Sequence, residues 1–552
     1  MVDSIIQSFD IWIDAQGVKS KGRVKSVENI SLEGIARLRE LILELAVRGK
    51  LVPQDPNDEP ANELLKRIEM ERKALNETVL LDIEENEKSF ALPTGWEWVR
   101  LQQIIQISSG DGLTAANMNG NGSIPVFGGN GINGCHDKNN VSKPTLVIGR
   151  VGFYCGSIHI TPNYAWVTDN AFITTFSEAN IYIKFLSWLL NGTNLKENDS
   201  ATAQPVISGR KIYPIVVALP PLKEQHCIVA KVDELMALCD KLEEQQTNNL
   251  KTHQLLVKTI LETLTQAADA NELQAAWERM ATHFDNLFCT EDSIDQLKQI
   301  ILQLAVMGKL VPQNLDDEPA SLLLEKIAKE KAHLVKEGKI KKQSTLLEIT
   351  EEEKSFNLPI GWTWAKLQTL VFLLGDGLHG TPTYTDETNY YFINGNNLND
   401  GKIEIKPGTK TVSKEEMLKY KKALSSNTVL VSINGTLGKV AFYNGEEIML
   451  GKSACYFNLS ENVYKYYIKV VLESKYYIDY AIRNATGTTI KNLGLKAMND
   501  FPIPLPSLPE QHRIVAKVDE LLAVCDALKV NILKAEEIKV QLAEAVVESA
   551  TA

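Results

Sequence analysis

Apolar side chains recur at helical spacing in a long segment that the chain contains twice. Residues 224–266 and 510–552 are both rich in Glu, Lys, Leu and Ala and carry no internal Gly or Pro, a composition that favours helix. The apolar positions alternate in steps of four and three residues, and the two sets are Ile228, Val232, Leu235, Cys239 and Leu242, and Ile514, Val518, Leu521, Cys525 and Leu528. This spacing predicts two long helices, each with a narrow apolar stripe that packs on another helix.

The two helices also begin with nearly the same letters. Glu224–Leu235 reads EQHCIVAKVDEL and Glu510–Leu521 reads EQHRIVAKVDEL, at an offset of 286 residues. Two unrelated amphipathic helices would not share such a string, so the chain contains an internal duplication. We expect the two apolar stripes to act as the pairing surfaces of a spacer made of these helices.

Other repeated text lies before each long helix. The string LAVRGKLVPQ at 45–54 returns as LAVMGKLVPQ at 304–313, and LPTGW at 92–96 returns as LPIGW at 358–362. In both halves a helical pattern precedes the first string, and its Gly and Pro are helix stop signals. The tryptophans Trp96, Trp98, Trp362 and Trp364 recur with this frame, so we interpret them as core aromatics rather than stacking platforms.

The text between these anchors differs between the two halves. Residues 99–215 and 365–500 are rich in Gly, Asn, Thr and Tyr, with short β-branched runs such as 145–148 and 428–433. Short runs separated by turn signals predict irregular, mostly β domains with a few helices. The pattern as a whole is that of two different recognition modules on one repeated scaffold, which is an α+β fold.

Charge and cysteine content narrow the class of protein. The net charge is −12, but residues 100–215 carry +2 and residues 366–500 carry +3, so the remainder carries −17. This distribution permits nucleic-acid contact in the two blocks and requires positive charge from partners for tight binding. Seven scattered cysteines without a Cys-x-x-Cys pair, and no apolar run of membrane-spanning length, predict a cytoplasmic protein.

The motifs that would indicate chemistry are incomplete. Residues 129–134 satisfy G-x-G-x-x-G, but loop-forming text follows where a dinucleotide site needs a helix. Residues 445–453 resemble a P-loop with one residue too many between the glycines. The histidines have no metal-ligand spacing, and Pro220-Pro221 lacks the polar and aromatic neighbours of an amino-methyltransferase loop. We therefore expect neither a catalytic residue nor a metal site in this chain.

The two blocks do offer side chains that read nucleic acid. Asn and Gln suit adenine, Arg and Lys suit guanine, and Ser and Thr suit phosphate, although each of these residues also forms turns. The candidate DNA-binding residues are Asn130, Asn133, Lys138, Arg150, Asn170 and Gln204 in the first block, and His379, Thr381, Tyr384, Asn394, Asn396, Asn434, Lys439, Lys452, Thr488, Thr489 and Lys491 in the second.

Taken together, these motifs resemble the specificity subunit of a type I restriction-modification enzyme over nearly the whole chain. The resemblance rests on the LPxGW strings, on the Gln-His starts of the long helices, on IPVFGGNG at 124–131 with WVTDNA at 166–171, and on TGTT at 486–489. It implies two target-recognition domains separated by two long antiparallel conserved helices, related by an internal pseudo-twofold repeat.

The resemblance further implies a non-catalytic, DNA-binding subunit that reads a bipartite asymmetric site. The expected partners are double-stranded DNA, two modification subunits that methylate adenine at N6, and motor-nuclease restriction subunits. S-adenosylmethionine, ATP and Mg²⁺ are then expected in the partners and no cofactor in this chain. The alternative is a helical assembly scaffold that does not bind DNA.

We expect the following segments: an N-terminal extension (1–30), a helical region (31–90), target-recognition domain 1 (91–221), a long helix (222–266), a linker (267–290), a second helical region (291–356), target-recognition domain 2 (357–509) and a second long helix (510–552).

Overall fold

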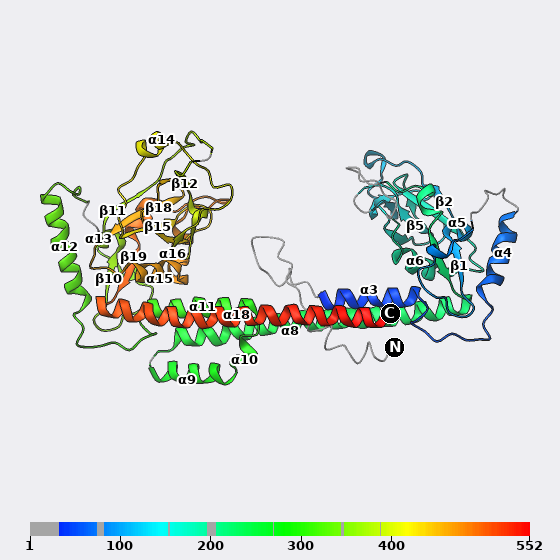
Figure 1. Cartoon of the computed structure of the whole chain (residues 1–552), viewed down its shortest axis with the longest axis horizontal. Coiled ribbons are helices and arrows are strands. Elements are labelled where there is room, and N and C mark those ends of the chain that lie inside the picture. Colours follow the sequence, from blue (N-terminus) through cyan, green and yellow to red (C-terminus); the bar gives the residue numbers. More distant parts are fainter. Residues whose placement is uncertain are drawn as a thin grey trace. The chain divides into compact units, whose positions relative to one another are not determined.

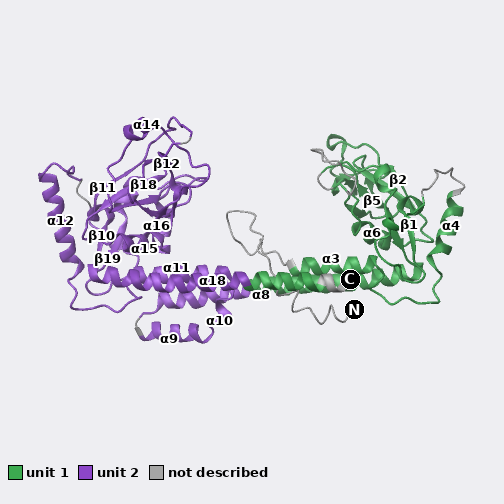
Figure 2. Ribbon diagram, in the orientation of Figure 1, with its two compact units in different colours: residues 1–251, 535–552 green, residues 252–534 purple. Residues whose placement is uncertain are grey.

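The computed structural model describes residues 33–73, 82–152, 155–195, 206–268, 270–343, 347–386 and 388–551. The chain forms two compact units, residues 1–251 with 535–552 and residues 252–534, which are coloured separately in Figure 2. The predicted N-terminal extension and Gln204 lie outside the described residues.

The first unit combines short strands with helices that flank them (Figure 1). Its elements are α3 (Glu33–Val47), α4 (Ala61–Lys73), the 3₁₀ turn η2 (Glu85–Glu87), β1 (Glu97–Arg100), α5 (Leu101–Ile104), β2 (Ile105–Ser109), η3 (Ala115–Asn117), β3 (Ile124–Gly128), β4 (Gly131–His136), β5 (Leu146–Gly149), β6 (Ile158–Ile160), β7 (Trp166–Val167), β8 (Ala171–Phe176), α6 (Ile183–Asn191), α7 (Gly209–Ile212), β9 (Val216–Leu219) and most of α8 (Leu222–Gln266).

The second unit repeats this order with additional elements. They are α9 (Ala270–Thr282), α10 (Phe284–Leu287), α11 (Glu291–Val306), α12 (Ala320–Lys336), η4 (Glu351–Glu353), β10 (Thr363–Lys366), α13 (Leu367–Leu370), β11 (Val371–Asp376), β12 (Tyr391–Ile393), η5 (Gly395–Asn397), β13 (Leu398–Asn399), β14 (Lys402–Ile403), α14 (Lys414–Lys419), β15 (Thr428–Ser432), β16 (Val440–Phe442), β17 (Ile448–Leu450), β18 (Ala454–Leu459), α15 (Lys465–Glu473), α16 (Lys475–Asn484), α17 (Leu495–Asp500), β19 (Pro502–Leu505) and most of α18 (Leu508–Thr551).

The main sheets of the two units have the same strand order. Each has a four-stranded antiparallel sheet, in the order β2-β8-β5-β6 in the first unit and β11-β18-β15-β16 in the second. Each also has a two-stranded antiparallel ribbon, β1-β9 or β10-β19, which joins the repeated LPxGW text to the strand that precedes the long helix. A parallel pair, β3-β7 or β12-β17, completes the match. The duplication expected from the sequence therefore includes the strand order of the two divergent blocks.

The apolar stripe of each long helix is buried within its own half of the repeat. In the first unit Ile228, Val232, Leu235 and Cys239 share a core with Leu38 and Leu45 of α3, and Arg39 of α3 pairs with Asp240 at 2.8 Å and with Glu243 at 2.7 Å. In the second unit Ile514, Val518 and Cys525 share a core with α11, and Lys529 pairs with Asp295 at 2.9 Å. Each stripe thus shares its core with the short helix of its own half, and direct pairing of the two stripes stays a prediction.

Both long helices also contribute to the core of the other unit. Val257, Leu261 and Leu264 near the end of α8 belong to the core of the second unit, and Ala543 near the end of α18 belongs to the core of the first. The chain therefore passes from the first unit to the second along α8 and returns along α18. The predicted linker is itself helical, since α9 and α10 lie in it. None of the described helices is both long and apolar enough for a membrane span.

Candidate nucleic-acid interface

In the first unit, three loops meet at one end of the four-stranded sheet. Strand β2 ends opposite the start of β8, with Ser109 paired to Phe172, and β5 ends there too, with Gly149 paired to Ala171. Backbone bonds continue past the strands, from Arg150 N to Asn170 O at 2.9 Å. We call residues 109–112, 150–152 and 168–170 the first edge.

The turn of the β3–β4 hairpin lies against the first edge. A side chain on Gly129 would place its Cβ 2.7 Å from the Val151 carbonyl oxygen and 3.2 Å from that of Asn170, and one on Gly149 would collide with Gly129 O. Glycine is required at both positions because another backbone comes this close. The structure thus brings Asn130, at the tip of the turn, to Arg150 and Asn170.

Two further candidates of the first block lie elsewhere along this hairpin. Asn133 is exposed on β4 next to the turn, with its amide against Gly128. Lys138 follows the end of β4, at the opposite end of the hairpin from the turn. Lys138 is exposed there, and Asn140, two residues later, donates to Asp111 Oδ2 of the first edge at 2.9 Å.

Two residues that sequence reasoning missed support the hairpin turn. The Ser157 hydroxyl donates to Gly129 O at 2.9 Å, and His159 Nε2 lies 3.3 Å from Ser157 Oγ. Burial lowers the pKa of His159, so its ring is neutral at physiological pH, and it lies beside Gly131. Nothing in the sequence links β6 to residue 129, because only the folded sheet brings them together.

The second unit has the corresponding edge. Strands β11, β15, β16 and β18 meet there, with Asp376 opposite Cys455, Ser432 opposite Ala454 and Val431 opposite Val440. We call residues 376–379, 434–439 and 451–453 the second edge. It carries four predicted side chains, which are His379, Asn434, Lys439 and Lys452.

Hydrogen bonds fix two of these side chains, His379 and Asn434, and attach a further loop. His379 Nε2 lies 2.6 Å from Asp376 Oδ2, a bond that the sequence reasoning missed although the string GDGL occurs in both blocks. Asn434 Nδ2 donates to Asn492 Oδ1 at 3.1 Å, and Gly435 N donates to Lys491 O at 2.9 Å. The loop that contains Thr488, Thr489 and Lys491 is therefore held on the second edge.

The remaining candidates of the second block have structural partners or lie apart. Asn394 Oδ1 accepts from Ser453 Oγ at 2.9 Å, so the amide is used in holding the turn beside the second edge. Tyr384 packs on Phe392 of β12 and lies under Lys410. Thr381 and Asn396 are exposed in neighbouring loops.

The repeated Glu-Gln-His text forms a latch where each long helix begins. The Trp96 indole donates to Glu224 Oε2 at 2.9 Å, and Gln54 donates to the other carboxylate oxygen at 3.1 Å. Gln225 accepts from Tyr182 N at 2.8 Å, and the His226 ring stacks on Tyr182 at 4.0 Å. Each residue of the Glu-Gln-His motif therefore makes a contact that supports the fold. Burial raises the pKa of Glu224, and the two donors oppose that rise.

The second unit has the same latch. Trp362 donates to Glu510 Oε2 at 3.0 Å, Gln511 accepts from Tyr464 N at 2.9 Å, and the His512 ring lies 3.8 Å from that of Tyr464. Burial again raises the pKa of Glu510. The interpretation of the repeated tryptophans as core aromatics is confirmed, since Trp96 and Trp362 are buried and the neighbouring Trp98 and Trp364 are half-buried.

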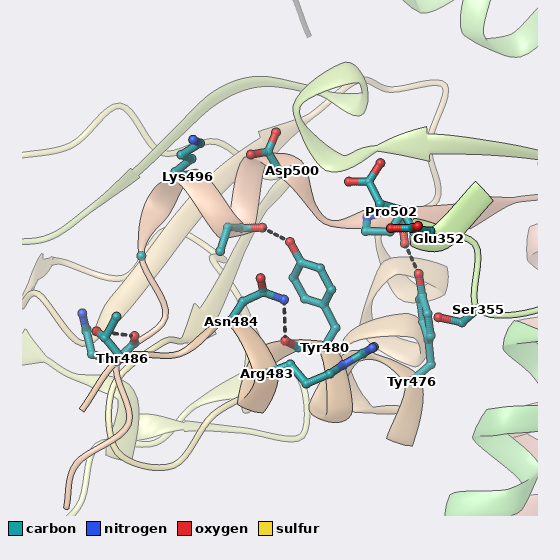
Figure 3. Close-up of a pocket in the computed structure, with 14 residues that line it drawn as sticks. Glu352, Ser355, Tyr476, Tyr480, Arg483, Asn484, Thr486, Lys496, Asp500 and Pro502 are labelled. Carbon is teal, nitrogen blue, oxygen red and sulfur yellow. Dashed lines mark hydrogen bonds between the residues drawn. The ribbon is translucent and has the colours of Figure 1, made fainter. Parts of the chain in front are cut away.

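A pocket of about 600 Å³ lies in the second unit, lined by residues of α16, α17 and η4 (Figure 3). Its aromatic wall is used by the fold, because Tyr476 donates to Pro502 O at 2.6 Å and Tyr480 donates to Ala497 O at 2.7 Å. Of its acids, Asp500 lies 3.7 Å from the buried Lys366. The pocket is thus a junction of α16, α17 and β19 rather than an array of free reactive groups.

The incomplete motifs do not form nucleotide sites. Residues 129–134 lie in the β3–β4 hairpin, without the following helix that a dinucleotide site needs. Residues 445–453 run through β17 into β18, again without a helix. Among the described residues, no group of three or more His, Cys, Asp or Glu side chains has metal-binding geometry.

Comparison with known proteins places this architecture in a family. The family model described as type I restriction modification DNA specificity domain matches residues 93–252 and 379–537. The chain is 35% identical to the EcoAI specificity subunit of Escherichia coli and 34% identical to the EcoEI specificity subunit, in each case over 99% of this chain and 99% of the relative. The crystal structure of the HsdS subunit from Thermoanaerobacter tengcongensis aligns with a TM-score of 0.38 at 16% identity, over 84% of this chain and 98% of that chain.

The identification rests on the family model and the two relatives. The two matched regions cover more than half of the chain, all of the first edge and most of the second. The relatives are specificity subunits, which are the non-catalytic members of their complexes. The chain belongs to the specificity subunits of type I restriction-modification enzymes, and it carries two target-recognition domains and assembles with the other subunits of such a complex.

Proposed function

We propose that the chain reads a bipartite, asymmetric site in double-stranded DNA and directs partner subunits to it. The observation that carries this proposal is the pair of edges. The four-stranded sheets have the same strand order, yet the first edge presents Arg150 and Asn170, whereas the second presents His379, Lys439 and Lys452. Amides, cations and imidazole form the hydrogen bonds that distinguish base pairs in the major groove. The two edges carry different side chains on the same strand order, and this difference supports two different half-sites.

The partners would supply the chemistry. We propose two modification subunits that carry S-adenosylmethionine and methylate adenine at N6, and motor-nuclease subunits that use ATP and Mg²⁺ to cleave DNA. The negative charge outside the two recognition blocks supports this division, because tight DNA binding then needs positive charge from partners. DNA as substrate also supports a cytoplasmic location.

The decisive experiment reconstitutes the chain with its modification subunits. We expect salt-dependent binding to one bipartite site, and methylated adenines in host DNA only when this chain is present. The isolated chain should not bind S-adenosylmethionine. An assembly scaffold would support complex formation without sequence-dependent binding or methylation, and that result would refute the proposal.

A further inference from the structure

Arg150 lies at the centre of the first edge with its backbone fixed on both sides. Its N–H donates to Asn170 O at 2.9 Å, and its carbonyl accepts from Ile207 N at 2.9 Å. The residue directly follows β5, so the sheet sets the direction in which its side chain leaves the backbone. An arginine placed in this way is held in position before any ligand binds.

The guanidinium is positioned but poorly bonded. It lies over the Phe172 ring at 5.4 Å, which restrains its plane. Its Nη1 has two long contacts of 3.5 Å, to Ser109 Oγ and to Asp169 O, while its buried Nε has no hydrogen-bond partner among the described residues. None of the described carboxylates pairs with it within 4.0 Å.

Other arginines of the first unit make short hydrogen bonds to both oxygens of a carboxylate. Arg100 bonds both oxygens of Glu87, at 2.9 and 2.8 Å, and also donates to two backbone carbonyls. Arg67 bonds both oxygens of Glu59 at 2.7 Å. By contrast, both Nη1 contacts of Arg150 are exposed and as long as 3.5 Å, so this end of the guanidinium is available to a ligand.

We propose that Arg150 reads a guanine in the half-site of the first domain, with its guanidinium bonded to O6 and N7 in the major groove. This inference rests on the proposed function and names the base class that one residue recognises. A planar donor pair held on an aromatic ring matches the two acceptors of guanine, and arginine is well suited to this bidentate contact. Asn130 and Asn170 flank it with amides that suit the neighbouring bases.

A phosphate contact is the competing assignment, and the structure favours the base. Phosphates are readily reached by exposed cations, and Lys138 in the same unit is exposed. Arg150 instead is half-buried, and a ring on one side and backbone on the other restrict its side chain. Lys138→Ala therefore serves as the matched control for charge.

The test uses the reconstituted methyltransferase complex and its mapped target site. Each guanine of the half-site read by the first domain is replaced in turn with 7-deazaguanine, which removes the N7 acceptor and keeps the base pair. We expect one position at which wild-type affinity falls by about tenfold or more, and loss of that sensitivity in Arg150→Ala, which has no side-chain donor for N7 or O6. Lys138→Ala should weaken binding at all sequences and keep the sensitivity.

Methylation mapping gives an independent readout. Arg150→Ala should relax one guanine position in the first half-site and leave the second half-site unchanged. Uniform loss of affinity without relaxation, or undiminished 7-deazaguanine sensitivity in Arg150→Ala, would overturn the assignment while sequence-specific binding by the wild-type complex still stands. Absence of any specific binding by the wild-type complex would instead refute the proposed function.

Discussion

Replacing Trp96 with Phe tests the latch at the start of α8. The substitution keeps an aromatic ring but removes the indole N–H, which donates to Glu224 Oε2 at 2.9 Å between two buried side chains. A hydrogen bond to a charged group contributes about 1.5–3 kcal/mol, and the loss leaves a buried carboxylate oxygen without its partner. We therefore expect the first turns of α8 to open more easily by about 2–3 kcal/mol.

Hydrogen exchange suits this measurement because a two-unit chain does not unfold in a single step. A change of 2–3 kcal/mol corresponds to exchange about 30 to 150 times faster for the buried amides that follow Glu224 in α8. The matched control is Trp98→Phe, whose ring packs on Phe90 at 4.8 Å and whose loss should change this exchange little. Trp362→Phe should open the start of α18 and leave the start of α8 unchanged, since the second latch lies in the other unit.

The latch also predicts a pH dependence with a definite sign. Burial raises the pKa of Glu224 above its unfolded value, and Trp96 is one of two donors that oppose the rise. A raised carboxyl pKa means that the folded state binds the extra proton, so stability falls as the pH rises through the folded pKa. Removing the donor raises this pKa further. The defect of Trp96→Phe should therefore be smaller at pH 5 than at pH 7, and equal defects at both values, or an equal defect in Trp98→Phe, would refute the reasoning.

Three other predictions concern different parts of the chain. Burial lowers the pKa of Lys331 to about 8, so the folded state releases this proton at a lower pH than the unfolded state. The free energy of opening of α12, measured by hydrogen exchange, should rise in the wild type relative to Lys331→Met between pH 8 and 10, and a constant difference across this range would mean that the lysine is solvated. Gly149→Ala would force the hairpin turn off the first edge and should abolish recognition of the first half-site in binding assays, whereas Gly120→Ala, with open space around it, should have no effect. Exchange of residues 99–215 for the block of another specificity subunit should change one half of the methylated site, and sequencing that found both halves altered would contradict two independent readers.

The sequence was sufficient for those parts of the fold that depend on local pattern or on repetition. The apolar steps predicted α8 and α18 closely, because a helix of this length leaves a periodic signal. The repeated LPxGW text correctly placed the tryptophans in the core. The short strands gave no such signal for their partners, and the parallel pairing of β3 with β7 depends on contacts 40 residues apart in the chain.

The candidate site was predictable in composition and only partly in arrangement. Arg150 and Asn170 do lie together, because both follow or precede strands that pair with each other. Asn394 was predicted to bind DNA because of its amide. In the structure this amide accepts a hydrogen bond from Ser453, so the residue supports a turn. Ser157 and His159 were missed because their task is to support a backbone turn that no sequence pattern links to them.

The two halves of the repeat have diverged differently at their two ends. In the repeated scaffold, a position can keep its hydrogen bond although its residue changes. Arg72 donates to the carbonyl of Gln102, and Lys331 donates to the equivalent carbonyl of Gln368. The edges keep the backbone and the Gly-Asp-Gly string, whereas most of their other side chains differ. In each unit a short helix, α5 or α13, connects the two-stranded ribbon to β2 or β11, and this strand ends at the edge. The four-stranded sheet therefore separates the edge from the ribbon.

This separation has a physical consequence for how target specificity changes. A substitution at an edge alters side chains at loop ends, where few core contacts are lost, whereas the latch that holds the lobe to its long helix stays intact. Arg150→Ala should accordingly leave hydrogen exchange at the start of α8 at its wild-type rate while it changes the sequence that is methylated. Within one recognition domain, different residues therefore determine stability and DNA recognition. For this reason two copies of the same scaffold can recognise different DNA sequences.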